Sequence, residues 1–135
     1  MSQIALDSFG AYQKARQLFD LVVTDMETVK TNPLCYRLVS QQMGSADSIC
    51  ANIEEGYGRL SRVEYVRFLD IARGSALETR GRYERMKHWF AQDVIQDRIN
   101  LIRERGLDPA RDQRGCSPPL ETPFNCARLK RRGLM

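Results

Sequence analysis

Hydrophobic residues recur every three or four positions through most of the chain, which is the spacing of one face of an α-helix. Four segments carry this pattern, and residues typical of turns and helix caps separate them. No segment alternates apolar and polar residues as a half-buried strand does. We therefore expect four helices, which span about residues 9–30, 33–55, 62–90 and 92–105.

Each of the first three segments contains a stripe that is predicted to face a shared core. In the first segment the stripe comprises Tyr12, Ala15, Phe19, Val22, Met26 and Val29. In the second it comprises Cys35, Val39, Gln42, Ala46, Ile49 and Ile53. In the third it comprises Tyr65, Leu69, Ala72, Ala76, Thr79, Tyr83, Met86 and Phe90.

Two breaks carry residues that suit the start of a helix. Asn32 is a good N-cap, and Pro33 after it fits the first helical position, where no backbone donor is needed. Ser61 stands three residues before Glu64, which is the spacing of a capping box. The second and third helices are therefore expected to begin at these two breaks.

The turn between the second and third segments contains two glycines, Gly56 and Gly58, which allow backbone conformations that other residues avoid. We expect Gly56 to act as the C-terminal cap of the second helix. Asn52, Glu55 and Arg59 cluster around the same turn. They form either a recognition site or a structural tie that prevents fraying of the bundle end, and we favour the structural tie.

Short connections between consecutive helices make them antiparallel neighbours. The sequence thus predicts an all-α protein, an antiparallel up-and-down four-helix bundle over residues 1–106. Its fourth helix is about half as long as the third. Residues 107–135 contain four prolines and a basic end without helical spacing, and we expect an irregular, mobile C-terminal tail there.

Gly44 and Gly74 lie at similar distances from the turn, on the second and third helices. Because a glycine inside a helix costs about 1 kcal/mol relative to alanine, two at one level suggest a close helix crossing. Ser75 is expected to lie at the same crossing. The alternative is that each glycine is simply tolerated on an exposed surface.

The composition is that of a folded protein with a modest positive charge. Of the 135 residues 42% are hydrophobic, and the formal net charge is +4, which permits binding to nucleic acid without requiring it. The first residues lack a basic leader, and no run approaches the ~18 apolar residues of a membrane span. We expect a cytoplasmic protein without a membrane partner.

Four cysteines and one histidine offer little to a metal or a reaction. None of the cysteines forms a C-x-x-C pair, so no metal site or cofactor is expected. Cys35 and Cys50 fall on apolar faces, where we expect buried free thiols, and Cys116 and Cys126 lie in the tail. His88 has no evident cysteine or serine partner, and we do not expect an enzyme.

The third helix carries a row of spaced cations that could follow a phosphate backbone. The candidate nucleic-acid-binding residues are Arg59, Arg62, Arg73, Arg80 and Lys87. The alternative is a solvated face with local ion pairs, since Arg80 with Glu84 and Glu78 with Arg82 stand four residues apart.

Two motifs carry a resemblance to a known family. The segment SICANIEEGYGR runs from Ser48 to Arg59, and FLDIARGSALE runs from Phe68 to Glu78. Together they resemble the bacterial four-helix-bundle family of the 23S ribosomal RNA intervening-sequence protein. A related branch is the accessory variability protein of diversity-generating retroelements, which works beside a reverse transcriptase. The resemblance implies a homopentameric ring and a non-enzymatic role linked to RNA.

Two functions remain open at this stage. The first is an oligomeric bundle that binds nucleic acid, with RNA favoured, or that assists a nucleic-acid enzyme such as a reverse transcriptase. The second is an adaptor that binds a protein through an apolar groove. The short fourth helix favours the adaptor, because it is expected to leave an apolar strip from Tyr65 to Ala76 uncovered.

Overall fold

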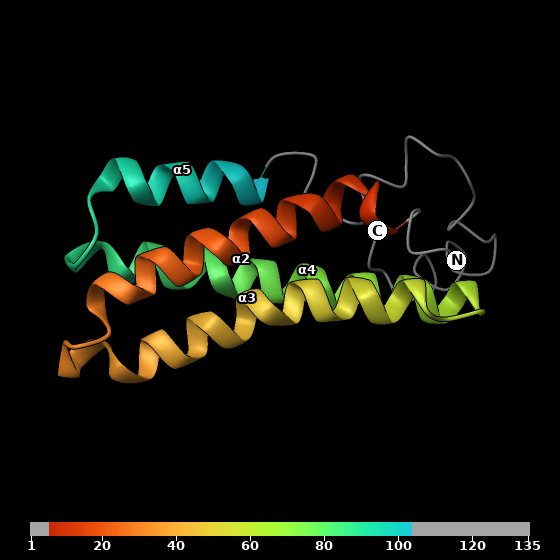
Figure 1. The fold of residues 1–135 in the computed structure, drawn as a ribbon, viewed down its shortest axis with the longest axis horizontal. Coiled ribbons are helices and arrows are strands. Elements are labelled where there is room, and N and C mark those ends of the chain that lie inside the picture. The colour runs from red at the N-terminus through yellow and green to blue at the C-terminus, as the bar shows by residue number, and fades with distance from the viewer. Residues whose placement is uncertain (1–5, 104–135) are drawn as a thin grey trace, which may run out of the picture.

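The computed structural model describes residues 6–103, which form an antiparallel four-helix bundle (Figure 1). Its helices are α2 (Gly10–Val29), α3 (Tyr36–Tyr57), α4 (Arg62–Arg85) and α5 (Gln92–Arg103). Single-turn 3₁₀ helices, η1 (Pro33–Cys35) and η2 (Met86–His88), precede α3 and follow α4. The described residues contain no strand, and the predicted all-α bundle is confirmed.

The predicted caps at both breaks are present. Asn32 Oδ1 accepts a hydrogen bond from the Leu34 amide at 3.0 Å at the start of η1. Ser61 Oγ accepts one from the Glu64 amide at 3.4 Å at the start of α4. Each cap satisfies an amide that the first helical turn leaves without a backbone partner, so the two helix starts are fixed by their own sequence.

The third helix ends earlier than its apolar spacing predicts. Regular α-helix stops at Arg85, and the chain tightens into η2 before it reaches Phe90. Met86, the first residue of η2, is fully buried. The apolar spacing continues past Arg85 because this tighter turn still packs on the core, and spacing alone does not separate it from α-helix.

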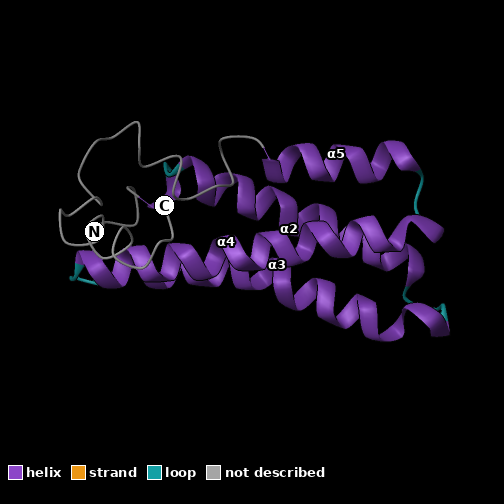
Figure 2. Cartoon of the chain, turned by 180° about the vertical axis from the view of Figure 1, so that it is seen from behind, coloured by secondary structure: helices purple, strands orange, loops and turns teal. Residues whose placement is uncertain are grey.

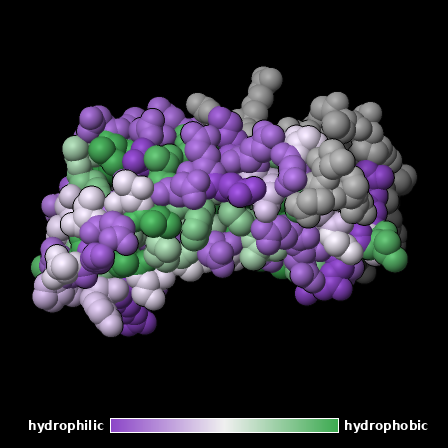
Figure 3. Space-filling view, viewed as in Figure 1, coloured by the Kyte–Doolittle hydropathy of each residue, from purple (hydrophilic) through white to green (hydrophobic). Residues whose placement is uncertain are grey.

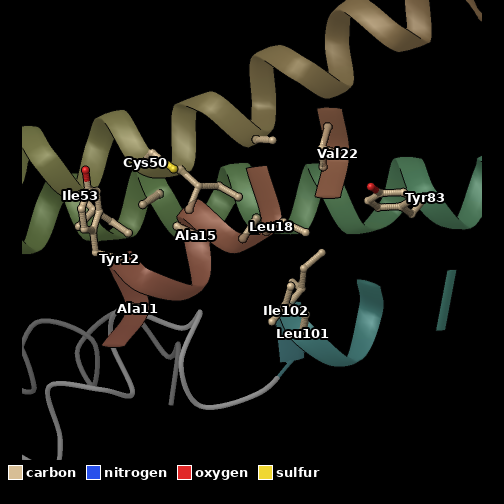
Figure 4. Close-up of a cluster of buried hydrophobic side chains, with 14 of the residues drawn as sticks. Ala11, Tyr12, Ala15, Leu18, Val22, Cys50, Ile53, Tyr83, Leu101 and Ile102 are labelled. Carbon is tan, nitrogen blue, oxygen red and sulfur yellow. The ribbon is translucent and has the colours of Figure 1, made fainter. Parts of the chain in front are cut away.

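The core lies where the four helices face one another, and Figure 4 shows part of it. Side chains of α2 pack against Cys50 and Ile53 of α3, with Tyr83 of α4 and Leu101 and Ile102 of α5 nearby. Ala15, Ala46 and Ala72 are completely buried, so these helices approach closely at small residues. The residues of the predicted stripes are buried, except Phe19, Val39 and Phe90, which are half-buried at its edge.

The predicted close crossing at Gly44 and Gly74 is wrong. Both glycines are exposed, and a Cβ atom added to either would meet nothing within 4 Å. The helices meet instead through Ser48 and Ser75, whose hydroxyls are 3.0 Å apart, so Ser75 does lie between α3 and α4. Neither glycine lies on the face where α3 and α4 meet, so each is tolerated on an exposed surface, as the alternative expected.

Gly56 is where α3 and α4 do come close. It lies inside α3 and is buried, whereas Gly58 occupies the C-cap with an ordinary right-handed φ of −78°. A Cβ on Gly56 would lie 3.1 Å from the Phe68 Cβ and 3.3 Å from the Tyr65 carbonyl oxygen. The predicted cap role of Gly56 is therefore wrong, and a close approach of α4 is what requires glycine there.

Helix α5 is 12 residues long against 24 for α4, so the predicted mismatch in length is confirmed. It packs on α4 and α2 and ends near the middle of the bundle in both views (Figures 1 and 2). Tyr65, Leu69, Ala72 and Ala76 are nevertheless all buried. These four residues therefore form no open apolar strip in the single chain.

A buried polar group joins three of the helices. Asp25 of α2 accepts hydrogen bonds from Arg98 of α5 and from the Tyr83 hydroxyl of α4, which lies 2.6 Å away. All three side chains are mostly buried, and burial raises the pKa of Tyr83 well above its ordinary range. This group holds α5 in place.

Within residues 6–103, no helix has the length and hydrophobicity that crossing a bilayer requires.

Candidate nucleic-acid interface

One flank of α4 carries the central part of the predicted cationic row. Arg62, Arg73 and Arg80 are eleven and seven positions apart, close to whole numbers of helical turns. They therefore lie on one side of the helix, over about 27 Å at 1.5 Å per residue. Lys87 follows seven positions later but belongs to η2, so helical spacing no longer defines its direction. We call Arg62, Arg73 and Arg80 the basic flank.

The cations of this row differ in how they are paired. Arg80 is half-buried, and its Nε lies 3.3 Å from Glu84 Oε1, as the local-pairing alternative expected. Arg62, Arg73 and Lys87 are exposed, and within residues 6–103 they form no ion pair. Three of the candidate cations are therefore available to a phosphate.

Arg59 is engaged within its own turn. It forms an ion pair with Glu55, and its guanidinium lies 5.1 Å from the centre of the Phe68 ring. Asn52 instead donates to the carbonyl and the hydroxyl of Ser48, at 2.7 and 2.9 Å. The Glu55–Arg59 tie is present as expected, whereas Asn52 contacts neither Arg59 nor the turn amides.

A polar seam runs between α3 and α4, which the apolar spacing does not reveal. Beyond the Ser48–Ser75 contact, Ser45 Oγ and Thr79 Oγ1 lie 2.8 Å apart, and Gln42 Nε2 donates to the Thr79 carbonyl at 2.9 Å. The visible signal was the spacing of Ser45, Ser48, Ser75 and Thr79 by three and four residues. Such buried hydrogen bonds are lost if the helices slide, so the seam fixes their register.

Arg82 ends the polar seam and was not predicted. Instead of pairing with Glu78 on the surface, it turns inward and keeps only 8% of its surface exposed. Its Nη1 donates to Gln42 Oε1 at 2.9 Å and Ser45 Oγ at 3.0 Å, with the Gln41 carbonyl at 3.4 Å. Burial lowers the pKa of this guanidinium, with a smaller contribution from nearby Arg85.

The described residues contain little that could act as a nucleophile or bind a metal ion. Cys35 and Cys50 are buried free thiols, and burial raises the pKa of Cys50 to about 11, which keeps the thiol protonated at neutral pH. His88 is exposed and stacks edge-on against Trp89. No group of three His, Cys, Asp or Glu residues able to hold a metal occurs within residues 6–103. Cys116, Cys126 and the predicted tail 107–135 lie outside the described residues.

Large exposed hydrophobic side chains are separated from one another. Leu34 and Tyr36 lie where the chain enters α3, and Leu60 and Val63 lie at the turn into α4, at the opposite end of the bundle. Figure 3 shows the face that carries α2 and α5, on which hydrophobic residues form separate patches among hydrophilic ones. Ile71 and Leu77 are also exposed, in the middle of α4, so the exposed apolar side chains are spread over both bundle ends and the centre of α4.

Antiparallel helices, a turn closed by Glu55 and Arg59 and a basic flank on α4 define a helical-bundle protein with a candidate anion-binding surface. The comparison with known families identifies the class. The chain belongs to the family described as 23S rRNA-intervening sequence protein, which matches residues 7–100. This range includes both motifs that carried the resemblance. Neither a curated protein nor a solved structure matches the chain.

Proposed function

We propose that this protein is a non-enzymatic, self-assembling bundle that binds RNA through the basic flank of α4, extended by Lys87. The observation that carries the proposal is that Arg62, Arg73 and Lys87 are exposed cations without a carboxylate partner among the described residues. The family description refers to an intervening sequence of 23S rRNA, which supports RNA as the nucleic acid. The net charge of +4 favours association with any polyanion.

The proposal includes a cytoplasmic location, self-association, with a homopentamer favoured, and action beside a reverse transcriptase of a diversity-generating retroelement. The location is the expectation from the sequence, and the self-association and the retroelement partner come from the resemblance. Self-association would multiply the effect of a short basic flank, because several copies in one assembly contact one RNA together. Three cations in one chain give weak binding alone, so assembly and RNA binding are expected to depend on each other.

Salt dependence of RNA binding provides the test. If Arg62, Arg73 and Lys87 each neutralise one phosphate of a single strand, one bound chain gives a slope of about −2 for log K against log salt. Fluorescence anisotropy with a labelled single-stranded RNA measures this slope. The R62A/R73A variant should bind more weakly, and its slope should fall to about −0.7 per chain, the contribution of Lys87 alone.

A matched control removes the same charge elsewhere. Arg37 lies on α3, and Arg67 pairs with Glu64 on the outer side of α4. The R37A/R67A variant has the same net charge as R62A/R73A and should retain the greater part of the slope. Equal losses in both double variants would show that only net charge matters, and would contradict binding through the basic flank.

The second candidate function is an adaptor for a protein partner, which exposed Leu60 and Val63 favour. Both stand at the turn rather than in a groove, so a partner would bind the bundle end. A photo-crosslinking residue at position 60, introduced in host cells, tests this function. A discrete adduct with one foreign protein supports the adaptor, and adducts only with RNA or with the protein's own copies argue against it.

A further inference from the structure

Arg82 is a buried cation whose inner contacts are all neutral. Its Nη1 bonds to an amide oxygen, a hydroxyl and a backbone carbonyl, from Gln42, Ser45 and Gln41. Removing a charge from water is unfavourable, and buried charges are ordinarily paired with an opposite charge. Glu78 is the nearby carboxylate that favours the charged form of Arg82, yet the two form no ion pair. The charge of Arg82 is thus left without a counterion.

The remaining donors of Arg82 are also free. Its Nε is buried and has no hydrogen-bond partner, and among the described side chains it is the one buried nitrogen or oxygen in this condition. Nη2 forms no hydrogen bond within residues 6–103 and is not fully buried, so it is the edge of the guanidinium that faces outward from the seam. Nη1 therefore anchors the guanidinium in the seam, and Nη2 at its outer edge can still donate.

A second arginine, Arg85, follows Arg82 by three residues on the same helix and lies over the neighbouring Gly81. Arg85 Nη1 is 3.2 Å from the point where a Cβ of Gly81 would lie, so its guanidinium folds back along α4 over the glycine. Its positive charge is felt at Arg82, which places two like charges close together. Arg85 is exposed and forms no ion pair within the described range. Like charges held together without an acid between them form a place of strong positive potential.

We propose that Arg82 and Arg85 form a phosphate-binding site at the outer edge of the α3–α4 seam. A guanidinium presents planar, paired donors that match phosphate oxygens, and two of them supply the charge for a dianion. A bound phosphate supplies the missing counterion for Arg82 and separates the two repelling cations. Gly81 leaves space beside Arg85 that a side chain would occupy.

This site is distinct from the basic flank. Arg80 and Arg82 are two positions apart, and such residues point to nearly opposite sides of a helix. The basic flank lies on one side of α4, whereas Arg82 faces α3 on the other. The site therefore does not depend on the proposed RNA binding, and each can be disrupted without the other.

Thermal unfolding of the full chain in phosphate provides the first test. Unfolding is followed by circular dichroism in sodium phosphate and in sodium chloride buffered to the same pH and ionic strength. At about five times its Kd, phosphate should raise the Tm by about 4 °C over chloride. The R85Q variant should lose this difference, and so should R82M, even if its Tm in chloride changes. The control R67Q, an exposed arginine of the same helix, should keep it.

The outcomes are decisive in both directions. Loss of the phosphate effect in R85Q and R82M, with retention in R67Q, supports the site. An equal phosphate effect in all four proteins, or none in the wild type, overturns it. The R62A/R73A variant should keep the full phosphate effect while its RNA binding weakens, so failure of the proposed function and failure of this site give different results.

A second experiment identifies the source of the phosphate. A short RNA is prepared with a 5′-phosphate and with a 5′-hydroxyl, and the affinity of the wild type for both is compared. A preference of about fivefold or more for the 5′-phosphate, lost in R85Q, assigns the site to the end of an RNA strand. Equal affinities, together with stabilisation by inorganic phosphate, assign it to free phosphate.

Discussion

Arg98 of α5 donates two parallel hydrogen bonds to Asp25 of α2, from Nε to Oδ2 at 2.9 Å and from Nη2 to Oδ1 at 3.0 Å. The carboxylate is 6% exposed and also accepts the Tyr83 hydroxyl. Two-pronged pairs of this kind are the strongest arrangement of arginine and carboxylate. This contact therefore joins α2, α4 and α5 at one point. The position of α5, the shortest helix, depends on it most.

Removing the Asp25 carboxylate should strongly destabilise the folded protein. We expect D25A to lower the free energy of unfolding by about 3–5 kcal/mol, because it leaves the buried Tyr83 hydroxyl without a partner and the mostly buried Arg98 with only the exposed Asp97. Urea denaturation followed by circular dichroism measures the loss. As a control, D97A removes the exposed second partner of Arg98 and should cost under about 1 kcal/mol. Equal losses in D25A and D97A would show that burial of the pair is unimportant.

The burial of Tyr12 and its hydrogen bond to Glu54 predict how the stability of the protein changes at high pH. Burial raises the pKa of Tyr12 to about 12, with a hydrogen bond to Glu54 at 2.8 Å as the next cause. A group whose pKa is higher in the folded state stabilises the protein below its unfolded pKa of about 10. That stability is lost as the pH rises from about 10 to 12. Urea denaturation between pH 8 and pH 11 should show a decline that is smaller in Y12F.

Tyrosinate absorbance checks the same point without denaturant. In the folded protein Tyr12 and Tyr83 should remain largely protonated at pH 11, because burial raises the pKa of both hydroxyls. Y12F should therefore leave the absorbance change between pH 9 and pH 11 unaltered. A decrease in that change would mean that Tyr12 titrates normally, contrary to its buried contact with Glu54.

Three glycines of the bundle should respond differently to alanine. G44A and G74A should each stabilise the protein by about 0.5–1 kcal/mol, because their surroundings are open and alanine favours the helix. G56A should destabilise it, because its methyl group would press on Phe68 and on the Tyr65 carbonyl. Melting temperatures of the three variants measure this order. A higher Tm for G56A than for G74A would refute the close approach at Gly56.

Substitutions of Arg82 and Asp25 should have different effects on the free energy of unfolding, although both residues are buried and charged. We expect R82M to unfold within about 1 kcal/mol of the wild type, or to be more stable, because methionine removes a charge that has no counterion. The lost contacts to Gln42 and Ser45 oppose this gain. Urea denaturation in phosphate-free buffer gives the value. A loss near that of D25A would mean that the three neutral acceptors satisfy Arg82 fully.

The sequence predicted what depends on local chemistry and on spacing. The helices, the caps at Asn32 and Ser61 and the two buried thiols follow from near neighbours in the chain, and the structure confirms them. The level at which Gly44 and Gly74 would meet was predicted wrongly. Spacing from the turn gives the level of a residue but not the side of the helix on which it lies, and both glycines lie on exposed sides.

The contacts that were not predicted are those made by polar side chains over long distances in the chain. Asp25 and Arg98 are 73 positions apart, and Arg82 reaches Gln42 across 40. In the sequence an arginine four residues from Glu78 suggests a surface pair. Its inward turn becomes visible only when the facing helix supplies hydroxyl and amide partners. Of the predicted row of cations, Arg59 and Arg80 are held in ion pairs, which leaves Arg62, Arg73 and Lys87 exposed without one within residues 6–103.

The half-length of α5 has a further consequence for how the molecule opens. Because α5 contacts only part of α4 and is fastened through Arg98, it can detach while the α3–α4 seam keeps its hydrogen bonds. Native-state hydrogen exchange should then show one cooperative unit formed by the α5 amides, with a lower opening free energy than those of α3 and α4. Release of this unit would uncover Tyr83 and Asp25 and create a transient apolar surface on an otherwise folded three-helix core.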